Sequence, residues 1–553
     1  MGARLLAGVS ASPGLAAGVA RRIWLEPPTG SELIAPELRP AELATARAAL
    51  ARAASDLEEL AGRLAGAGRA EEAEIVATGT LMAADPAFDD AIASRVVTGG
   101  EGAAVALLAA SAGFADLIAS LPDPLLAERA DDIRSLGRRA ARHALGIAEE
   151  VSGAADVVVL AESLGPADVA DFGPEVVAVA LAAGGSRAHA AIVARSLGIP
   201  MVVGAGSELL AWPAGGQVLV DGDRGQVRLD PGPAELASAQ AAVGEARGDR
   251  ARSREERDLP AETPDGRRLR LFANASSLPE LRVAFDQGAE GVGLLRTELL
   301  FLDAGGWPDL AAHRRLLRPL LARIGDRPVT LRLLDFGGDK TPPFLLGEDG
   351  RGIELLLAAP AALRAQLEAV AELCPPRLRL LLPMVTDAAQ VAAVRALVDE
   401  LWVTGKPPLG AMIEVPLAAR RAGSLAEVCD FFSIGTNDLT QLQLGVDRSR
   451  PGEAPAHHPE VLRLIESTVA GAATRGLSVE VCGEAASDPI SLPLLIGLGV
   501  DELSVGASRV GAVRRAVRRL NYEEARRLAG LALRAADAAE VKGLVAEVGD
   551  AVG

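Results

Sequence analysis

The second half of the chain repeats one pattern eight times: a short apolar run typical of a buried strand, followed by a longer stretch with helical periodicity. The runs lie at residues 269–274, 291–295, 329–334, 378–384, 409–414, 431–435, 479–482 and 502–505. Eight such units in succession predict a (β/α)8 barrel, a fold that carries its catalytic groups at the carboxyl ends of its strands.

Polar side chains recur where these runs end. They are Arg296 after the second run, Arg332 and Lys340 with the third, Glu414 at the end of the fifth, Asn437 and Asp438 after the sixth, and Cys482 at the end of the seventh. A surface position would explain any one of them but explains the whole set poorly. Because the strands of such a barrel end at one face, we expect these side chains to gather at one mouth.

The cationic residues of this set indicate the kind of ligand. With one further arginine, they are Arg296, Arg332, Lys340 and Arg448. Their combined charge suits a small polyanion, and arginine is favoured because its guanidinium binds phosphate or carboxylate through two N–H groups. We therefore expect a phosphorylated acid as the ligand.

Two carboxylates and one thiol complete the predicted mouth. Glu414 and Asp438 offer hard oxygen ligands of the kind that Mg²⁺ takes when substrate oxygens and water complete its octahedron. Cys482, in the sequence Val-Cys-Gly-Glu, could exchange a proton with a carbon atom. Cys374 and Cys429 are better explained as buried, unreactive cysteines. No CxxC pair is present, which favours a reducing cytoplasm over a disulfide framework or a zinc site.

A histidine, His189, stands at the start of a predicted helix in the first half of the chain. Residues 176–181 have the pattern of a buried strand, Gly184 and Gly185 that of a turn, and Ala188 begins the helix. The free N–H groups at a helix start attract anions. His189 is therefore a candidate for chemistry on an anionic ligand, and the alternative is a capping or core histidine.

The hydrophobic pattern changes twice in the rest of the first half, from helical to strand-like and back to helical. From residue 40 to about 145 the pattern is helical, with an apolar stripe at Leu43, Leu50, Leu57 and Leu64, seven residues apart. Strand-like runs follow at 157–160, 176–181, 201–203, 218–220 and 227–229. Residues 234–259 are alanine-rich and charged, lie between prolines, and predict a helical linker.

Charge and hydropathy exclude several classes of partner. A formal net charge of −18 argues against nucleic acid and against an anionic membrane surface. Uninterrupted apolar runs stay well below the roughly 18 residues of a membrane span, and the start lacks the pattern of a signal peptide. We expect a soluble, cytoplasmic protein.

Seven motifs together resemble one known family. They are Gly-Val-Ser-Ala-Ser-Pro-Gly at 8–14, Gly-Gly-x-x-x-His-x-x-Ile-x-Ala-Arg at 184–195, Arg-Thr-Glu at 296–298, Gly-Gly-Asp-Lys at 337–340, Phe-Phe-Ser-Ile-Gly-Thr-Asn-Asp-Leu-Thr-Gln at 431–441, Val-Asp-Arg at 446–448 and Cys-Gly-Glu at 482–484. Over essentially its whole length the chain resembles Enzyme I of the phosphoenolpyruvate (PEP)-dependent sugar phosphotransferase system.

The resemblance implies a multidomain α/β fold. Residues 1–20 and 145–230 would form a swivelling α/β phosphohistidine domain, residues 21–144 an inserted α-helical domain that docks the phosphocarrier HPr, residues 231–260 a helical linker, and residues 261–553 a (β/α)8 barrel that binds PEP and forms a homodimer. The implied activity is that of a PEP-protein phosphotransferase. It passes the phosphoryl group of PEP to its own histidine and then to a histidine of HPr, with release of pyruvate.

The resemblance also implies roles for individual residues. His189 would take the phosphoryl group, Glu414 and Asp438 would bind Mg²⁺, and Cys482 would protonate the enolate. The residues that would hold PEP are Arg296, Arg332, Arg351, Asn437 and Arg448, with Lys340 from the same mouth. Phosphoryl transfer depends mainly on positioning and on neutralising the equatorial oxygens, which arginines and Mg²⁺ both serve.

The chain departs from the family pattern at three places. Arg187 and Ala188 replace the usual Thr-Ser before the histidine, Glu354 stands where a second arginine is common, and Thr78 and Thr80 stand where the family tends to carry glutamate and histidine. Two alternatives stay open, of which only the second is suggested by departures, those at Arg187, Ala188 and Glu354. A pyruvate-phosphate dikinase or PEP synthase relative would need a nucleotide-binding domain, for which the helical insert is too short. A degenerate, non-catalytic binding protein would not take label from PEP.

Overall fold

The computed structural model describes residues 4–22, 33–66, 69–120, 129–147, 156–185, 188–302, 304–338, 340–348, 350–446 and 455–552. The chain divides into two compact units, Met1–Arg247 and Gly248–Gly553. The helix α9 (Pro233–Glu255) contains the point of division. Within the described ranges, every helix is too short or too polar to cross a membrane.

The first unit contains an eight-stranded sheet that joins the start of the chain to residues beyond 156. Its strands are β1 (Arg4–Ala7), β2 (Val9–Ser12), β3 (Leu15–Arg22), β4 (Val157–Ala161), β5 (Val176–Leu181), β6 (Met201–Val203), β7 (Gln217–Asp221) and β8 (Gln226–Leu229). Their order is β1-β8-β7-β3-β4-β5-β6-β2. Strand β3 pairs with β4 in parallel and with β7 antiparallel, so the first strands of the chain are integral to the sheet.

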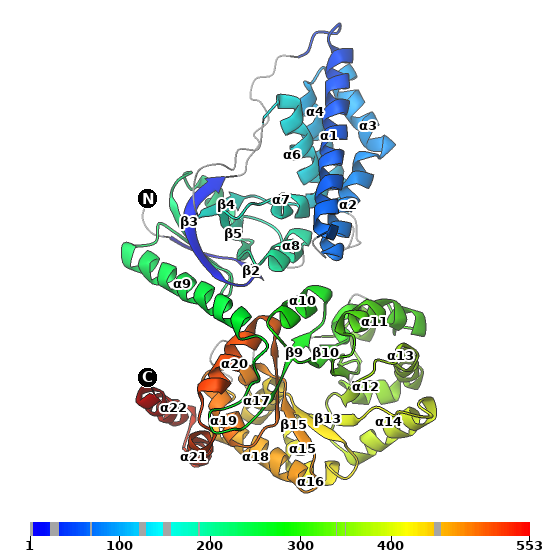
Figure 1. Ribbon diagram of the computed structural model, residues 1–553. Helices are drawn as coiled ribbons and strands as arrows, with labels where there is room; N and C mark the ends of the chain where they lie inside the picture. The colour runs from blue at the N-terminus through cyan, green and yellow to red at the C-terminus, as the bar shows by residue number, and fades with distance from the viewer. Residues whose placement is uncertain are drawn as a thin grey trace. The chain divides into compact units, whose positions relative to one another are not determined.

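Several helices accompany this sheet in the described part of the first unit (Figure 1). Those between β3 and β4 are α1 (Arg39–Gly66), α2 (Ala70–Ala83), α3 (Pro86–Ala93), the π-helix η1 (Ser94–Thr98), α4 (Ala103–Ala119) and α6 (Ala130–Leu145). Among the sheet strands lie α7 (Pro166–Ala170), α8 (His189–Leu197) and η2 (Ser207–Ala211). The predicted apolar stripe on α1 is confirmed, because Leu50, Leu57 and Leu64 are buried in the helical core.

The second unit is a closed barrel of eight parallel strands. They are β9 (Arg270–Ala275), β10 (Val292–Arg296), β11 (Val329–Arg332), β12 (Leu378–Leu382), β13 (Leu409–Ile413), β14 (Phe431–Ile434), β15 (Ser478–Val481) and β16 (Glu502–Gly506). Each strand pairs with the next along the chain, and β16 closes the ring on β9. All eight predicted runs are strands within a few residues of their predicted bounds, which confirms the (β/α)8 barrel.

Helices surround the barrel strands (Figure 1). They are α10 (Leu278–Asp286), η3 (Glu298–Phe301), α11 (Leu310–Ile324), η4 (Pro343–Leu345), α12 (Ile353–Ala358), α13 (Pro360–Leu373), α14 (Ala388–Leu401), α15 (Pro416–Arg420), α16 (Ala422–Leu425), α17 (Thr436–Leu444), α18 (Pro459–Ala473), η5 (Glu484–Ser487), α19 (Ser491–Gly497), η6 (Ala507–Arg509) and α20 (Val510–Arg519), followed by α21 (Tyr522–Ala532) and α22 (Ala538–Val552). One apolar core fills the space between strands and helices.

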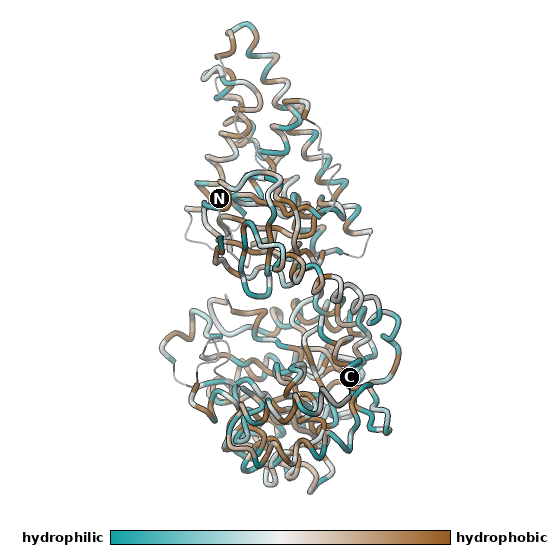
Figure 2. Tube along the Cα trace, turned by 90° about the vertical axis from the view of Figure 1, so that its left-hand side faces the viewer, coloured by the Kyte–Doolittle hydropathy of each residue, from teal (hydrophilic) through white to brown (hydrophobic). Residues whose placement is uncertain are grey.

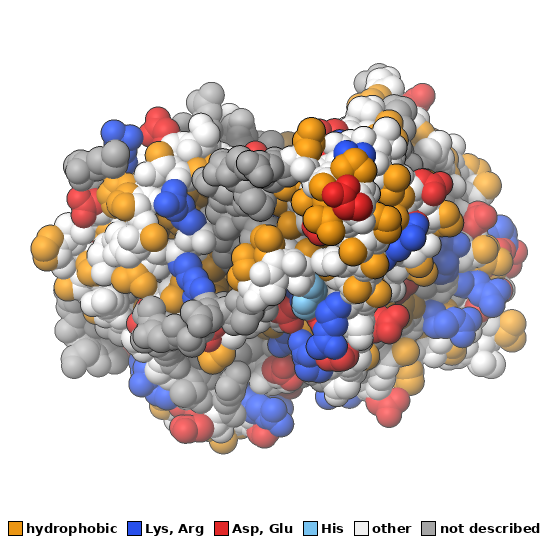
Figure 3. Space-filling view, turned by 90° about the horizontal axis from the view of Figure 1, so that it is seen from above, with side chains coloured by type: hydrophobic (Ala, Val, Ile, Leu, Met, Phe, Trp, Pro, Cys, Tyr) orange, Lys and Arg blue, Asp and Glu red, His pale blue; other side chains and the backbone are white. Residues whose placement is uncertain are grey.

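The surface follows from this burial. Hydrophobic and hydrophilic stretches alternate along the helices, as expected where one helix face packs inward (Figure 2). Acidic and basic side chains lie mixed with hydrophobic ones across the face shown in Figure 3.

Candidate active site

The carboxyl ends of the barrel strands carry most of the polar residues that the sequence singled out. Arg296 and Arg332 end β10 and β11, and Glu414 directly follows β13. Asn437 and Asp438 lie in the first turn of α17, after β14. Because all eight strands are parallel, these residues lie at the same end of the barrel.

Arg332 is the most deeply buried cation of this end, with only 4% of its side chain exposed. Its Nη2 donates to Glu298 and lies 3.2 Å from Oδ2 of Asp335. Burial works against the charged guanidinium, but Glu298 and Asp335 outweigh it and raise the pKa of Arg332 above its ordinary value. The arginine is therefore permanently charged and fixed in place.

Two further cations share the same carboxylates. Nζ of Lys340 lies 2.9 Å from Oδ2 of Asp335 and 3.4 Å from Oε1 of Glu298. Nη1 of Arg351 donates to Oδ1 of Asp438 at 2.9 Å, and its Nε lies 3.9 Å from Asp335. Although burial opposes its charge, the surrounding cations hold the pKa of Asp335 below its ordinary value. The loop after β11 thus carries Lys340, outside the strand itself, into the arginine cluster.

Several donors of this cluster are buried without a hydrogen-bond acceptor among the described residues. They are Nε of Arg296, Nε of Arg332 and Nη2 of Arg351. Buried polar groups in proteins are nearly always satisfied, so such donors need an acceptor from elsewhere. Carboxylate and phosphate oxygens are the acceptors that guanidinium groups bind most strongly.

The two predicted metal ligands, Glu414 and Asp438, influence one another electrostatically. Glu414 is buried and its Oε1 accepts from the backbone N–H of Met384 at 2.7 Å. Burial and then the charge of Asp335 raise the pKa of Glu414 to about 8, and Asp438 adds to the effect while Arg332 opposes it. The described residues contain no group of three or more His, Cys, Asp or Glu side chains that could together hold a metal ion. Two carboxylates are nonetheless enough for Mg²⁺, which commonly completes its shell with substrate oxygens and water.

Cys482 follows β15 and faces the inside of the barrel. It packs against Leu294, Leu381, Met412 and Phe431 and is buried. Burial raises the pKa of Cys482 to about 12, and the charge of Glu480 adds to the effect. The group is therefore a thiol, with a proton to donate, at neutral pH.

The other two cysteines were both predicted to be buried. That prediction is confirmed for Cys429 but wrong for Cys374, which is exposed. Cys374 ends α13 in a left-handed conformation and faces solvent.

The loops after β14 and β15 hold one another in place. Oδ1 of Asn437 accepts from the N–H of Glu484 at 2.9 Å. A Cβ on Gly483 would come within 2.0 Å of Oγ1 of Thr436, so only glycine fits here. This explains the glycine of the Cys-Gly-Glu motif, which lets the loop of Cys482 approach that of Asn437.

Sequence reasoning missed the two carboxylates that organise the cluster. Glu298 and Asp335 are fully buried and neutralise Arg332 and Lys340. Both follow strand ends, so the rule that found the cations could have found them too. Arg448, predicted to bind PEP, lies outside the described residues.

His189 is the first residue of α8, as predicted from the glycine turn before it. Gly184 has a φ of 97°, a conformation that other residues rarely adopt. Nδ1 of His189 lies 3.0 Å from Oδ2 of Asp132 on α6, and 18% of the histidine side chain is exposed. Burial raises the pKa of Asp132, whereas the histidine lowers it. An N–H at Nδ1 facing this carboxylate leaves the lone pair on Nε2.

An ion pair between α6 and α7 stabilises the packing of α6 on the strand-rich part of the unit. Nη2 of Arg138 on α6 donates to Oδ2 of Asp168 on α7 at 3.0 Å, and Asp168 also accepts from the N–H of Gly165. Burial opposes this charge, but Arg138 and Gly165 hold the pKa of Asp168 below its ordinary value. This brace fixes α6, and with it Asp132, against the segment that precedes α8.

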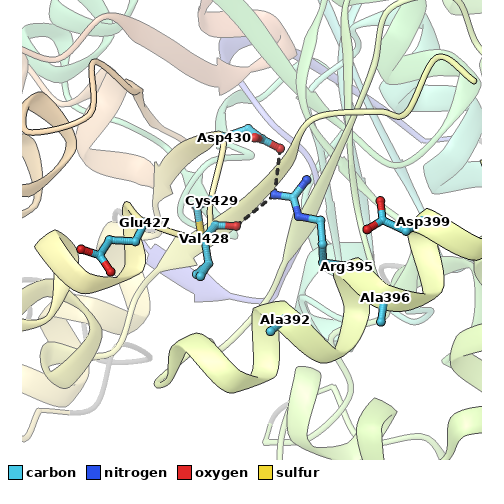
Figure 4. A pocket seen from close by; sticks show the side chains of 8 residues that line it. All are labelled: Ala392, Arg395, Ala396, Asp399, Glu427, Val428, Cys429 and Asp430. Atoms are coloured by element: carbon cyan, nitrogen blue, oxygen red, sulfur yellow. Dashed lines mark hydrogen bonds and ion pairs between the residues drawn. The ribbon is translucent and has the colours of Figure 1, made fainter.

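Two grooves lie away from these residues. One of about 450 Å³, lined by Arg395, Cys429 and Asp430 among others, is shown in Figure 4. Asp430 directly precedes β14, so this groove lies at the amino end of that strand, and Arg395 there is paired with Asp430 at 2.9 Å. The other, of about 410 Å³, lies between α1, α2 and α3 and includes Thr80. The hydroxyls of Thr78 and Thr80 donate to carbonyls of their own helix.

Comparison with known families gives matches along most of the chain. Residues 7–129 match the PEP-utilising enzyme N-terminal domain, residues 153–225 the PEP-utilising enzyme mobile domain, and residues 250–522 the PEP-utilising enzyme PEP-binding domain. The PEP-binding match contains every barrel residue discussed above, and the mobile-domain match contains His189.

Individual relatives agree with these matches. A phosphoenolpyruvate-protein phosphotransferase of Staphylococcus carnosus is 32% identical over 99% of this chain and 99% of its own length. A multiphosphoryl transfer protein of Xanthomonas campestris is 38% identical over 78% of this chain and 54% of its own length, so the chain spans about half of that relative. A protein of Escherichia coli named for the phosphoenolpyruvate-dependent phosphotransferase system is 34% identical over 78% of this chain and 61% of its own length.

Proposed function

This chain belongs to the family of PEP-utilising enzymes, and we propose that it is a PEP-protein phosphotransferase that passes the phosphoryl group of PEP to His189 and then to a phosphocarrier protein. The observation that carries the proposal is the arginine cluster at the carboxyl end of the barrel. Its buried donors lack acceptors among the described residues. PEP would supply both a carboxylate and a phosphate.

In this proposal the barrel mouth binds PEP and neutralises its charge. Arg296, Arg332 and Arg351 bind its oxygens, with Lys340 and Asn437 beside them and Arg448 as a further ligand. Phosphoryl transfer requires little covalent chemistry from the protein, because positioning and electrostatic stabilisation provide most of the rate. Glu298 and Asp335 hold Arg332 and Lys340 in place, so no reorganisation is needed when the substrate arrives.

Glu414 and Asp438 fit a bound Mg²⁺. A divalent cation held by the two carboxylates would offset the burial and the nearby negative charge that raise the pKa of Glu414, and would keep that group ionised. When bound, the ion would add positive charge on the phosphoryl oxygens. Oδ1 of Asp438 accepts from Arg351, and the second carboxylate oxygen would be the one offered to the metal.

Cys482 acts as the general acid. Cleavage of the phosphate ester leaves the enolate of pyruvate, which needs a proton on its methylene carbon. The thiol of Cys482 supplies that proton, and the product is pyruvate. The high pKa of Cys482 keeps this proton in place until the enolate forms.

His189 acts as the nucleophile through Nε2. Asp132 accepts the N–H of Nδ1 and so stabilises the charge that the imidazole ring gains as it takes the phosphoryl group. The start of α8 adds backbone N–H groups beside the new anion. His189 and Asp132 belong to the first unit, whereas the residues proposed to bind PEP belong to the barrel.

The acceptor of the phosphoryl group is proposed to be an HPr-like phosphocarrier that docks on the helices between β3 and β4. The groove that includes Thr80 offers it a surface with both apolar and charged residues. A homodimer formed through the barrel and a cytoplasmic location complete the proposal. Both belong to what the resemblance of the motifs to Enzyme I implies.

Label transfer tests the proposal. The full chain is incubated with ³²P-labelled PEP and Mg²⁺, without nucleotide, and protein-bound label is measured before and after acid treatment. We expect acid-labile label that His189→Ala abolishes. His143→Ala is the matched control, because His143 also pairs with an aspartate, Asp56 at 2.6 Å, but lies inside α6. Unchanged label in His189→Ala, or none in the parent chain, contradicts the proposal.

A further inference from the structure

Strands β10 and β11 separate at the barrel mouth, directly after two of the arginines that the proposed reaction uses. Their backbone pairing ends at Arg296 and Arg332. The chain after β10 turns into η3, which begins at Glu298, whereas the chain after β11 continues as a loop through Asp335. Buried backbone groups beyond the end of a strand pairing need hydrogen-bond partners from elsewhere.

A glutamine of α13 provides such a partner. Gln366 is fully buried. Its Oε1 accepts from the backbone N–H of Leu334 at 3.1 Å, and its Nε2 donates to Oγ1 of Thr297 at 3.0 Å. Because the backbone N–H can only donate, it fixes which end of the amide faces each partner. Gln366 thus connects the segment after β10 with the segment after β11.

The side chain of Thr297 extends this connection to Arg332. Its hydroxyl donates to the backbone carbonyl of Arg332 at 2.8 Å. Thr297 stands directly before η3, where a threonine hydroxyl commonly caps the start of a helix, but here it forms no cap. Hydrogen bonds therefore run from Leu334 through Gln366 and Thr297 to Arg332, and we call this set the Gln366–Thr297 bridge.

Both ends of the bridge lie next to a carboxylate that holds the guanidinium of Arg332. Glu298 directly follows Thr297 in the chain, and its side chain accepts from Nη2 of Arg332. Asp335 directly follows Leu334, and its Oδ2 lies 3.2 Å from the same nitrogen. A shift of either segment would move one carboxylate relative to the other, and the guanidinium between them would move as well.

We infer that Gln366 and Thr297 are positioning residues of the proposed reaction, which fix the segments after β10 and β11 so that Arg332 is aimed at the phosphoryl group of PEP. The inference rests on the proposed function. Both residues act through Arg332 and its two carboxylates, and neither is assigned a contact with PEP. Positioning of this kind matters because a misplacement of about 1 Å can lower a rate by about 100-fold.

Two variants break the bridge without a large change of side-chain size. Gln366→Met removes both polar atoms but keeps the length of the side chain, and Thr297→Val removes the hydroxyl but keeps the shape. Each should lower the rate of labelling at saturating PEP by about 30-fold. The half-saturating concentration of PEP should change by less than about threefold, because Arg332 keeps its charge and attracts the substrate as before.

Two further variants show whether the hydrogen bonds themselves are responsible. Thr297→Ser retains the hydroxyl and should label within about threefold of the parent rate. The double variant of Gln366→Met and Thr297→Val should be no more than about threefold slower than the slower single variant, because both changes break one bridge. If the two losses multiply instead, the residues act separately and the bridge is overturned.

Single-turnover labelling of the full chain with ³²P-labelled PEP and Mg²⁺ measures the rate, the half-saturating concentration of PEP and the final labelled fraction. Thr468→Val is the matched control. Thr468 is also fully buried in the barrel unit, but its hydroxyl donates to the carbonyl of Leu464 at 2.8 Å within α18. Its labelling rate should stay within about twofold of the parent. Thr297→Val tests the same bridge if Gln366→Met does not fold.

Each other outcome overturns a distinct claim. An unchanged rate in folded Gln366→Met and Thr297→Val means that Arg332 needs no such positioning, and overturns the inference. A lower labelled fraction at an unchanged rate means that the bridge affects stability alone, and an equal slowing in Thr468→Val means that any lost hydroxyl has this effect. Either result overturns the inference. No labelling of the parent chain overturns the proposed function, and the inference with it.

Discussion

The barrel mouth and the surroundings of His189 are both built from residues far apart in the sequence, but by different means. In the barrel, eight parallel strands end at one face, so Arg296, Arg332 and Glu414 come together because of their place in each repeat. His189 is brought to Asp132 by the packing of α6, a helix 57 residues earlier in the chain. The strand repeat therefore allows the barrel mouth to be predicted from sequence, whereas the surroundings of His189 depend on a tertiary contact that the sequence does not reveal.

The largest expected effect comes from removing Arg332, the buried cation at the barrel mouth. Arg332→Ala should slow labelling from PEP at least about 1,000-fold, because it removes charge from the transferring group and takes from Glu298 and Asp335 a buried cation that Lys340 replaces only in part. Breaking such a buried pair should also lower the free energy of unfolding by about 3–5 kcal/mol. Initial labelling rates and denaturant titration measure the two effects.

Arg395→Ala is the control for that variant. Arg395 also pairs with an aspartate in the barrel unit, but at the amino end of β14. Labelling should stay within about twofold of the parent, since an arginine outside the mouth carries no charge to the substrate. A similar loss in both variants would mean that the effect of Arg332 is one of stability alone.

The second-largest expected effect concerns the hydrogen bond between Asp132 and His189. Asp132→Asn should slow labelling about 100-fold, since an amide N–H facing Nδ1 favours the tautomer that carries its proton on Nε2 and so removes the nucleophile. Single-turnover labelling measures the rate. Asp56→Asn, which changes the partner of His143, should leave it unchanged. Normal labelling of Asp132→Asn would show that the observed hydrogen bond is not used in catalysis.

The smallest effect concerns the brace between α6 and α7. The folded pKa of Asp168 lies below its unfolded value, so its ionisation stabilises the fold above that unfolded value, about 4, and the contribution is lost as pH falls through the folded pKa. Asp168→Asn should lower the free energy of unfolding by about 3 kcal/mol at pH 7 and by less near pH 3. It should slow labelling only a few-fold.

Denaturant titrations at the two pH values measure this difference. Asp221→Asn is the control, because Asp221 pairs with exposed Arg224 at 3.8 Å and should change stability by no more than about 0.5 kcal/mol. A difference for Asp168→Asn that is the same at pH 7 and pH 3 would mean that its charge does not brace the helix.

These contrasts show which parts of the molecule the sequence could reveal. The strand repeat located the barrel and its mouth, and the turn at Gly184 located the start of α8. The sequence could not show that Arg351 donates to Asp438 or that Asp132 lies beside His189. The periodicity of a helix predicts which of its faces is buried, but not which distant residue packs against that face.

The central claim is that PEP phosphorylates His189 on the nitrogen that Asp132 leaves available for attack. Its most direct test is ³¹P and ¹⁵N NMR of the full chain, labelled with ¹⁵N in histidine, after reaction with PEP and Mg²⁺. The account predicts one phosphohistidine, at His189, with phosphorus bonded to Nε2 and a proton on Nδ1. Phosphorus on Nδ1, or on any residue other than His189, would contradict it.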